Sequence, residues 1–316
     1  MEAFITIILD NREILSGVCG ANDGNLKVIE GYLGGRITAR GNEIYAEGLD
    51  NQRFKLIMDD LIAAALKGES PSPEYVKALA ETKDACAEIS EDPIRKAMIQ
   101  IPHGFSRIYP RSKNQAAYIE GMRSCEVAFC VGPAGTGKTF LAIAEAMQLV
   151  LSKKMRKLVL TRPVVEAGES LGFLPGDLIQ KINPYLRPLY DAMEALVPYE
   201  TIRQMEDTRA IEIAPLAYMR GRSLNDSVII LDEAQNTTRE QMKMFLTRLG
   251  RGSRAVITGD ATQIDLPKRV DSGLLHAVSL LSHVEGIHFA YLHTQDVVRN
   301  PLIKKIIQAY DDEKKS

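Results

Sequence analysis

The sequence predicts an α/β protein in which a smaller α/β domain precedes a larger domain, built on a parallel sheet with helices on both faces. In the second part of the chain, short and continuously apolar runs alternate with helical segments, which is typical of buried parallel strands. A segment rich in serine and proline, 68–73, separates the two parts and indicates a linker. The expected strands are Val127–Val131, Leu158–Thr161, Val228–Leu231, Ala255–Thr258 and His288–Leu292.

The first part is expected to form a domain of residues 1–68. Its polar and apolar residues alternate around Gly41-Asn42, which predicts a hairpin. The expected elements are strands at Phe4–Leu9 and Glu13–Val18, a helix at Asp23–Tyr32, hairpin strands at Arg36–Arg40 and Glu43–Glu47, and a helix at Asn51–Leu66. Residues 69–105 are expected to be a helical connector, and residues 106–316 to form the larger domain.

The composition is that of an ordinary soluble globular protein, with 316 residues, 45% hydrophobic and 25% charged. No apolar run approaches the length of a membrane span, and Phe4–Leu9 is too short for the apolar region of a signal peptide. Cys19, Cys86, Cys125 and Cys130 form no C-x-x-C pair. We therefore expect no disulfide and no structural metal, as is usual in a reducing cytoplasm.

The net charge of −2 is unevenly distributed. Residues 1–68 and 69–105 each carry a net charge of −3, whereas residues 106–316 carry +4. Any attraction of a polyanion is therefore expected to come from the larger domain, because the protein as a whole is not basic.

A phosphate-binding motif lies between an expected strand and an expected helix. Residues 132–139 fit G-x-x-x-x-G-K-[ST] at every defined position. The glycines let backbone N–H groups surround phosphate oxygens, while Lys138 neutralises the β- and γ-phosphates and Thr139 binds Mg²⁺. The expected nucleotide-binding residues are Gly132, Pro133, Ala134, Gly135, Thr136, Gly137, Lys138 and Thr139. The motif predicts a RecA-like P-loop NTPase domain.

Two carboxylates follow the apolar strand expected at Val228–Leu231. In nucleotide hydrolases an aspartate in this position holds Mg²⁺, which here would be Asp232. The adjacent Glu233 can orient and deprotonate the attacking water. A water base favours hydrolysis over nucleotide binding alone, and it argues against a small-molecule kinase.

Two further polar side chains are candidates for contact with the γ-phosphate. Gln263 follows the strand expected at Ala255–Thr258, and glutamine can both sense phosphate oxygens and align water. Arg299, near the C-terminus, could meet the charge that develops on the γ-phosphate, although its position in the sequence, taken alone, favours a surface role.

The order of these motifs resembles the PhoH family of ATPases over about residues 106–310. The resemblance rests on the phosphate loop, Leu231–Asn236 and the segments 111–115, 161–169, 172–177, 258–263 and 298–299. PhoH domains resemble the motor core of superfamily 1 helicases. The resemblance implies that Gln115 contacts adenine, that Arg299 contacts the γ-phosphate, and that Thr161–Gly168 lines a nucleic-acid path.

Residues 1–68 resemble the KH-type domain that precedes the ATPase in bacterial PhoH-like proteins. The segment Gly20–Lys27 occupies the place of the GXXG phosphate clamp, but three residues separate Gly20 from Gly24 and one of them is Asp23. RNA binding and protein docking both remain open for this domain. It lacks the acidic cluster of the PIN-type nuclease that another branch of the family carries.

Two functions follow from these features. The first is an ATP-driven, helicase-like enzyme that remodels single-stranded RNA in RNA or ribosome metabolism. The second is a nucleotide-dependent adaptor that docks a separate endoribonuclease. One RecA-like domain leaves the γ-phosphate open to water unless something covers it, so we expect a closed homo-oligomer, with six subunits favoured. A neighbouring subunit would then supply Arg248 or Arg251 as a trans arginine finger.

Overall fold

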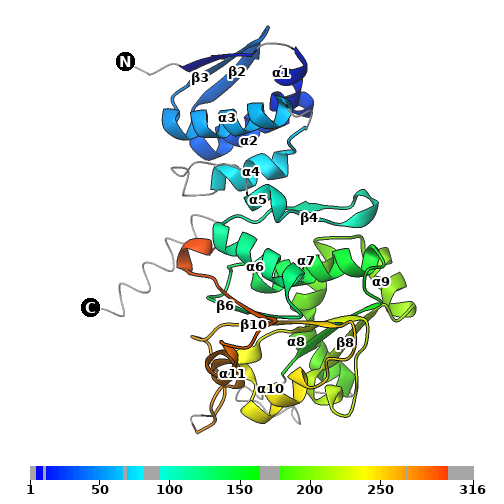
Figure 1. The fold of residues 1–316 in the computed structure, drawn as a ribbon. Helices are drawn as coiled ribbons and strands as arrows, with labels where there is room; N and C mark the ends of the chain where they lie inside the picture. The colour runs from blue at the N-terminus through cyan, green and yellow to red at the C-terminus, as the bar shows by residue number, and fades with distance from the viewer. Residues whose placement is uncertain are drawn as a thin grey trace. The chain divides into compact units, whose positions relative to one another are not determined.

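The computed structural model describes residues 5–9, 12–66, 70–81, 93–163, 178–267 and 269–297 (Figure 1). The chain divides into two compact units. The first contains residues 1–98 and 107–113, and the second contains residues 99–106 and 114–316.

The first unit contains an antiparallel sheet in the order β1-β3-β2. Its elements are β1 (Ile5–Ile8), α1 (Arg12–Cys19), α2 (Gly24–Leu33), β2 (Arg36–Arg40), β3 (Glu43–Glu47) and α3 (Asn51–Leu66). The prediction of a strand at Glu13–Val18 was wrong, because these residues lie in α1. Ile14 and Val18 are one helical turn apart and both are buried, which is the spacing of a helix face.

The compact core of the first unit extends beyond residue 68, where the sequence suggested that the domain ends. Tyr75 and Val76 of α4 (Pro73–Glu81) are buried in the same hydrophobic cluster as Phe54 and Ile29. Asn25 also donates a hydrogen bond to the carbonyl of Pro71 (3.0 Å). The first helix of the expected connector therefore packs as part of this unit. α5 (Pro93–Lys96) and β5 (Arg107–Ile108) also belong to this unit, whereas β4 (Ile99–Gln100) belongs to the second.

The second unit contains a six-stranded, wholly parallel sheet in the order β11-β6-β10-β9-β7-β8. The strands are β6 (Val127–Val131), β7 (Lys157–Arg162), β8 (Ile211–Pro215), β9 (Ser227–Leu231), β10 (Arg254–Gly259) and β11 (Ile287–Tyr291). The five predicted strands are present to within a residue or so at each end. The sixth, β8, was not predicted, since it lies at the edge of the sheet and Glu212 interrupts its apolar run.

Helices cover both faces of this sheet, which confirms the predicted fold class. α6 (Lys113–Ser124) and α7 (Lys138–Leu151) lie on one face, and α10 (Arg239–Leu246) and α11 (Gly273–Leu281) lie on the other (Figure 1). Two more helices, α8 (Leu178–Glu194) and α9 (Tyr199–Asp207), complete the unit. Phe129 stacks on Phe289 with ring centroids 4.9 Å apart, and Phe245 and Leu274 pack into the same core. None of the helices that the structure describes is both long and apolar enough to cross a membrane.

The strand order brings three separate sequence segments together. β10 lies between β6, which leads into the phosphate loop, and β9, which leads to Asp232 and Glu233. Because parallel strands end at the same edge of a sheet, the loops after these strands converge there.

Candidate nucleotide-binding site

The phosphate loop connects the end of β6 to the start of α7. Gly135 and Gly137 have φ angles of 82° and 83°, a conformation that favours glycine. Gly132 is required for a different reason, since a Cβ at this position would lie 2.5 Å from the carbonyl oxygen of Leu292. These glycines therefore allow a tight loop whose backbone N–H groups can face an anion.

Lys138 and Gln115 both contact this loop. The Lys138 ammonium is buried and donates hydrogen bonds to the carbonyls of Gly132 (2.7 Å) and Pro133 (2.8 Å). Gln115 of α6 donates to the carbonyl of Thr136 (2.9 Å) and is also buried. In this arrangement the lysine stabilises the loop from within.

Asp232 accepts hydrogen bonds on both of its carboxylate oxygens. Oδ1 accepts from the hydroxyls of Thr139 and Thr258, each at 2.7 Å. Oδ2 accepts from Nε (2.8 Å) and Nη2 (2.5 Å) of Arg162. Thr139 and Asp232, the two predicted metal ligands, are thus in direct contact, and their oxygen atoms are of the hard type that Mg²⁺ prefers. The contacts made by Thr258 and Arg162 were not predicted.

Glu233 follows Asp232 in a left-handed backbone conformation, with φ 54° and ψ 37°. Such a conformation is costly for a residue other than glycine and is concentrated at functional sites. Gln235 donates to Glu233 Oε2 (2.7 Å), and Arg162 Nη2 lies 3.5 Å from Oε1. The Glu233 side chain is 46% exposed, so water can reach the carboxylate that is expected to act as the base.

The loop after β10 contacts the phosphate loop directly through Asp260. This buried carboxylate accepts hydrogen bonds at Oδ2 from the backbone N–H of Ala134 (3.0 Å) and from the Gln263 side chain (3.0 Å). Gln235 Oε1 in turn accepts from the backbone N–H of Asp260 (3.0 Å). Gln263 was predicted as a site residue. The contacts of Asp260 and Gln235 were not predicted, because they join segments that are distant in the sequence.

These segments surround a cavity of about 270 Å³, lined by residues of the phosphate loop together with Asp232, Glu233, Asp260 and Gln263. Burial raises the pKa of Tyr118 and of Cys130, which lie in α6 and β6, so both stay neutral at physiological pH. The structure thus brings together most of the predicted site residues. Arg299, most of the segment expected to line a nucleic-acid path, and the matching segment 172–177 lie outside the described residues.

The two expected arginine fingers lie at the end of the strands opposite to the cavity. Arg248 and Arg251 precede β10, so they are near the amino-terminal ends of the strands, whereas the cavity is at the carboxyl-terminal ends. Arg248 Nη1 also donates to the carbonyl of Arg222 (3.1 Å). Within one chain, neither arginine is placed to reach the cavity.

Comparisons with known proteins find similar sequences over most of this chain. Residues 107–311 match the family model described as PhoH-like protein. The chain is 45% identical over 307 residues to a PhoH-like protein of Bacillus subtilis, covering 96% of each, and 45% identical over 300 residues to a PhoH-like protein of Mycobacterium tuberculosis, covering 94% of this chain and 85% of the relative. Protein PhoH of Escherichia coli is 41% identical over 207 residues, covering 65% of this chain and 58% of that protein.

Among solved structures, the Pif1 helicase from Candida albicans matches with a TM-score of 0.33 and 16% identity, over 62% of this chain and 42% of that one. A likeness this distant gives no information about activity. The family model spans the phosphate loop and the Asp232-Glu233 pair, since it covers residues 107–311, and the relatives cover most of the chain. The chain belongs to the PhoH family.

Proposed function

We propose that this protein is a Mg²⁺-dependent ATPase that acts on single-stranded RNA. The observation that carries the ATPase part is the contact between Thr139 and Asp232 in the lining of the phosphate-loop cavity, which Glu233 also lines. Thr139 and Asp232 would hold Mg²⁺, which neutralises phosphate charge when bound. An ATPase assay with and without single-stranded RNA tests both parts of the proposal.

The backbone and the side chains of the site have separate roles in the proposed hydrolysis. The N–H groups of the loop bind phosphate oxygens, and Lys138 exchanges its carbonyl partners for phosphate oxygens. Glu233 accepts a proton from the attacking water, and Gln235 holds the other side of its carboxylate. Gln263 is the candidate sensor of the γ-phosphate. The family resemblance assigns Gln115 to adenine and Arg299 to the γ-phosphate.

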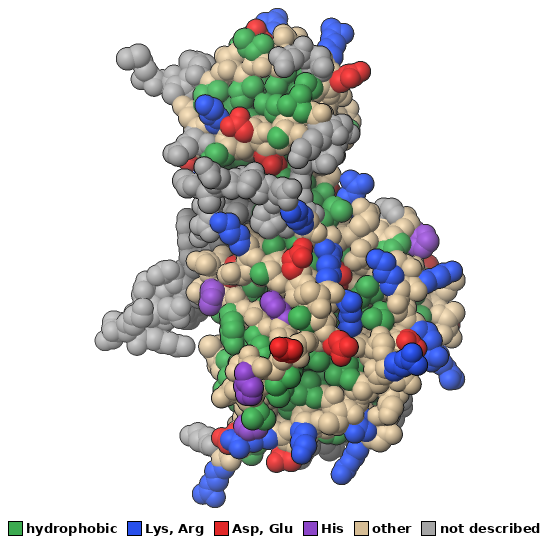
Figure 2. Space-filling view, viewed as in Figure 1, with side chains coloured by type: hydrophobic (Ala, Val, Ile, Leu, Met, Phe, Trp, Pro, Cys, Tyr) green, Lys and Arg blue, Asp and Glu red, His purple; other side chains and the backbone are tan. Residues whose placement is uncertain are grey.

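A basic edge supports the RNA part of the proposal. We use this name for the exposed Lys153, Lys154, Arg156 and Arg251, which lie in turns that precede β7 and β10, at the amino-terminal ends of the strands. Hydrogen bonds from Arg156 N–H to the Asp226 carbonyl (2.8 Å) and from Asp226 N–H to the Arg251 carbonyl (3.0 Å) connect the turns that carry these residues. Many Lys and Arg side chains of the larger unit lie on its right-hand side in Figure 2. Such a surface attracts the phosphates of a polyanion.

Replacing Lys154 and Arg156 together by glutamine is expected to weaken RNA binding and RNA-stimulated turnover, while basal turnover stays unchanged. The affinity for RNA should also depend less steeply on salt. The slope of log K against log salt concentration should become shallower by about 0.7 for each phosphate contact removed. Fluorescence anisotropy over a salt series measures both effects.

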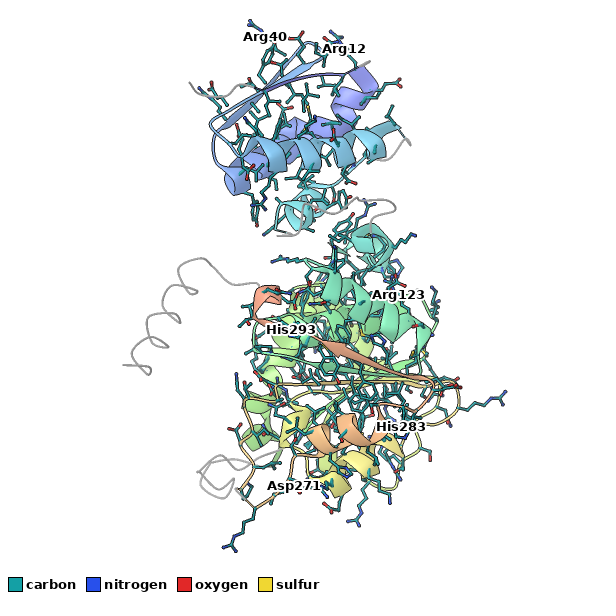
Figure 3. The ribbon with its side chains drawn as sticks, turned by 60° about the vertical axis from the view of Figure 1, so that its left-hand side comes forward. Arg12, Arg40, Arg123, Asp271, His283 and His293 are labelled. Carbon is teal, nitrogen blue, oxygen red and sulfur yellow. The ribbon has the colours of Figure 1, made fainter. Side chains whose placement is uncertain are left out.

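The matched control replaces two exposed arginines of the first unit, Arg12 and Arg40, by glutamine (Figure 3). If only this control loses affinity, RNA binds the first unit and the basic edge has another role. If RNA leaves the ATPase rate of the parent unchanged, the hypothesis of an RNA-remodelling ATPase is rejected. The alternative, a nucleotide-dependent adaptor that docks a separate endoribonuclease, is then favoured.

We also propose a closed homo-oligomer, with six subunits favoured. Of the described residues that line the cavity, Lys138 alone is basic, so these residues do not supply the additional positive charge that an arginine gives to the γ-phosphate in the transition state. An arginine from a neighbouring subunit would supply it, and the exposed Arg251 is the stronger candidate because Arg248 is engaged within its own chain.

Mixing inactive Lys138→Ala subunits with inactive Arg251→Ala subunits is therefore expected to restore part of the ATPase activity. A mixed interface combines an intact loop from one chain with an intact arginine from the other. Arg187→Ala, which removes an exposed arginine of α8, should be active by itself. A fully active monomer in light scattering at micromolar concentration would exclude the oligomer.

A further inference from the structure

Arg162, the last residue of β7, connects the two acidic residues of the site. Its guanidinium donates from Nε and Nη2 to Asp232 Oδ2 and lies 3.5 Å from Glu233 Oε1 through Nη2. The contact exists because β7 is the immediate neighbour of β9 in the sheet, with Thr161 in register with Leu231. A single arginine therefore contacts both the expected metal ligand and the expected water base.

The burial of this group makes its charge important. The Arg162 side chain is 14% exposed and that of Asp232 is 3% exposed, so water screens their interaction weakly. Lys138 is turned toward the carbonyls of Gly132 and Pro133 instead. Arg162 is thus the cation that balances the carboxylates of Asp232 and Glu233 in this arrangement of the site.

The contacts also divide the oxygens of Asp232 between two partners. Arg162 contacts Oδ2, while Oδ1 faces the hydroxyl of Thr139. On the neighbouring residue, Arg162 lies at Oε1 of Glu233 and Gln235 holds Oε2. A planar guanidinium with several N–H groups in fixed directions suits this double role, and an ammonium does not.

We propose that Arg162 is a positioning residue that aligns Glu233 for water activation and, by its charge, weakens the binding of Mg²⁺ at Thr139 and Asp232. The proposal rests on the proposed ATPase function. It makes Arg162 part of the hydrolytic site rather than a residue of a nucleic-acid path. The two effects separate in experiment, since one depends on geometry and the other on charge.

A second arginine–carboxylate pair in the same unit provides the control. Arg123 of α6 donates from Nε and Nη2 to the two oxygens of the buried Glu145 of α7, at 3.1 and 3.0 Å (Figure 3 labels Arg123). This pair is also bidentate and partly buried, but it touches neither Asp232 nor Glu233. Arg123→Gln therefore reports the effect of losing a buried ion pair alone.

The test compares Arg162→Gln, Arg162→Lys, Arg123→Gln and the parent. Fluorescent-ATP titrations over a series of Mg²⁺ concentrations give the half-saturating Mg²⁺, and steady-state kinetics give kcat and KM. Thermal unfolding with and without Mg²⁺ alone, in the absence of nucleotide, provides a readout that does not depend on activity.

For Arg162→Gln we expect the half-saturating Mg²⁺ to fall by about tenfold, because a buried positive charge is lost. We expect kcat to fall by about ten- to a hundredfold, part of what a general base contributes, with KM little changed. Mg²⁺ alone should raise the Tm of this variant more than that of the parent. Arg162→Lys should keep the parental Mg²⁺ dependence but not the parental kcat. Arg123→Gln should lower only the Tm.

Parental Mg²⁺ dependence in Arg162→Gln, or identical behaviour of Arg162→Gln and Arg162→Lys, would overturn the proposal. Identical behaviour of Arg162→Gln and Arg123→Gln would do the same, since it would leave Arg162 a purely structural role. Failure of the parent to bind nucleotide with Mg²⁺ would instead reject the proposed function itself, before any variants are compared.

Discussion

Lys138→Ala is expected to abolish tight ATP binding. The Lys138 ammonium is the only basic side chain among the described residues lining the cavity, and its present partners are neutral carbonyls. Exchanging these neutral carbonyls for the anionic β- and γ-phosphates adds an attraction between opposite charges to the hydrogen bonds that the ammonium donates, and Lys138→Ala removes that attraction. A fluorescent-nucleotide titration measures the loss.

Lys153→Ala is the matched control for this variant. Lys153 is exposed just beyond the far end of α7, the helix that Lys138 begins, so its loss should leave nucleotide affinity unchanged. Circular dichroism should show that both variants are folded. Unchanged affinity in a folded Lys138→Ala protein would reject the assignment of the phosphate loop.

Glu233→Gln is expected to separate binding from hydrolysis. The amide keeps the shape of the side chain, and Arg162 retains its two hydrogen bonds to Asp232, so ATP binding should survive. The amide cannot accept a proton from water, and turnover should fall by roughly 10²–10⁴, the usual contribution of a general base. Measuring phosphate release alongside nucleotide affinity in the same preparation distinguishes the two effects.

Glu240→Gln removes an exposed carboxylate from the first turn of the neighbouring α10 and should hydrolyse ATP at the parental rate. Parental turnover in Glu233→Gln would place the water base elsewhere. Loss of binding in that variant would show that the charge of Glu233, rather than its basicity, supports the site.

The strands that could be predicted are those whose burial leaves a local pattern. β6, β7, β9 and β10 are covered on both faces, so each forms a continuous apolar run. An edge strand such as β8 has only one neighbouring strand and tolerates Glu212, which weakens the pattern. α1 was missed because its eight residues contain only about two turns, too few to separate a helical from an alternating pattern.

The residues of the candidate site also differ in whether a local sequence pattern could predict them. The phosphate loop, Asp232 and Glu233 could be predicted because their chemistry depends on residues adjacent in sequence. The contact of Arg162 with Asp232 depends on the order of the strands instead, since 70 positions separate the two residues. The contact of Asp260 with Ala134, across 126 positions, depends on β10 lying next to β6. Pairings of this kind belong to the topology of the sheet rather than to any one segment.

The hydrogen bond between Asp260 and Ala134 has a consequence for nucleotide affinity. A carboxylate that contacts an N–H group of the phosphate loop competes with an incoming phosphate for that group. The apparent affinity for the nucleotide is then the intrinsic affinity multiplied by the fraction of molecules in which the Asp260 carboxylate has left this N–H group. Because Asp260 also contacts Gln263, and its N–H contacts Gln235, displacing this carboxylate would change the partners of both glutamines. Nucleotide binding would therefore be coupled energetically to the conformation of the segment after β10. The equilibrium lies between a conformation in which Asp260 contacts the phosphate loop and one in which the nucleotide does.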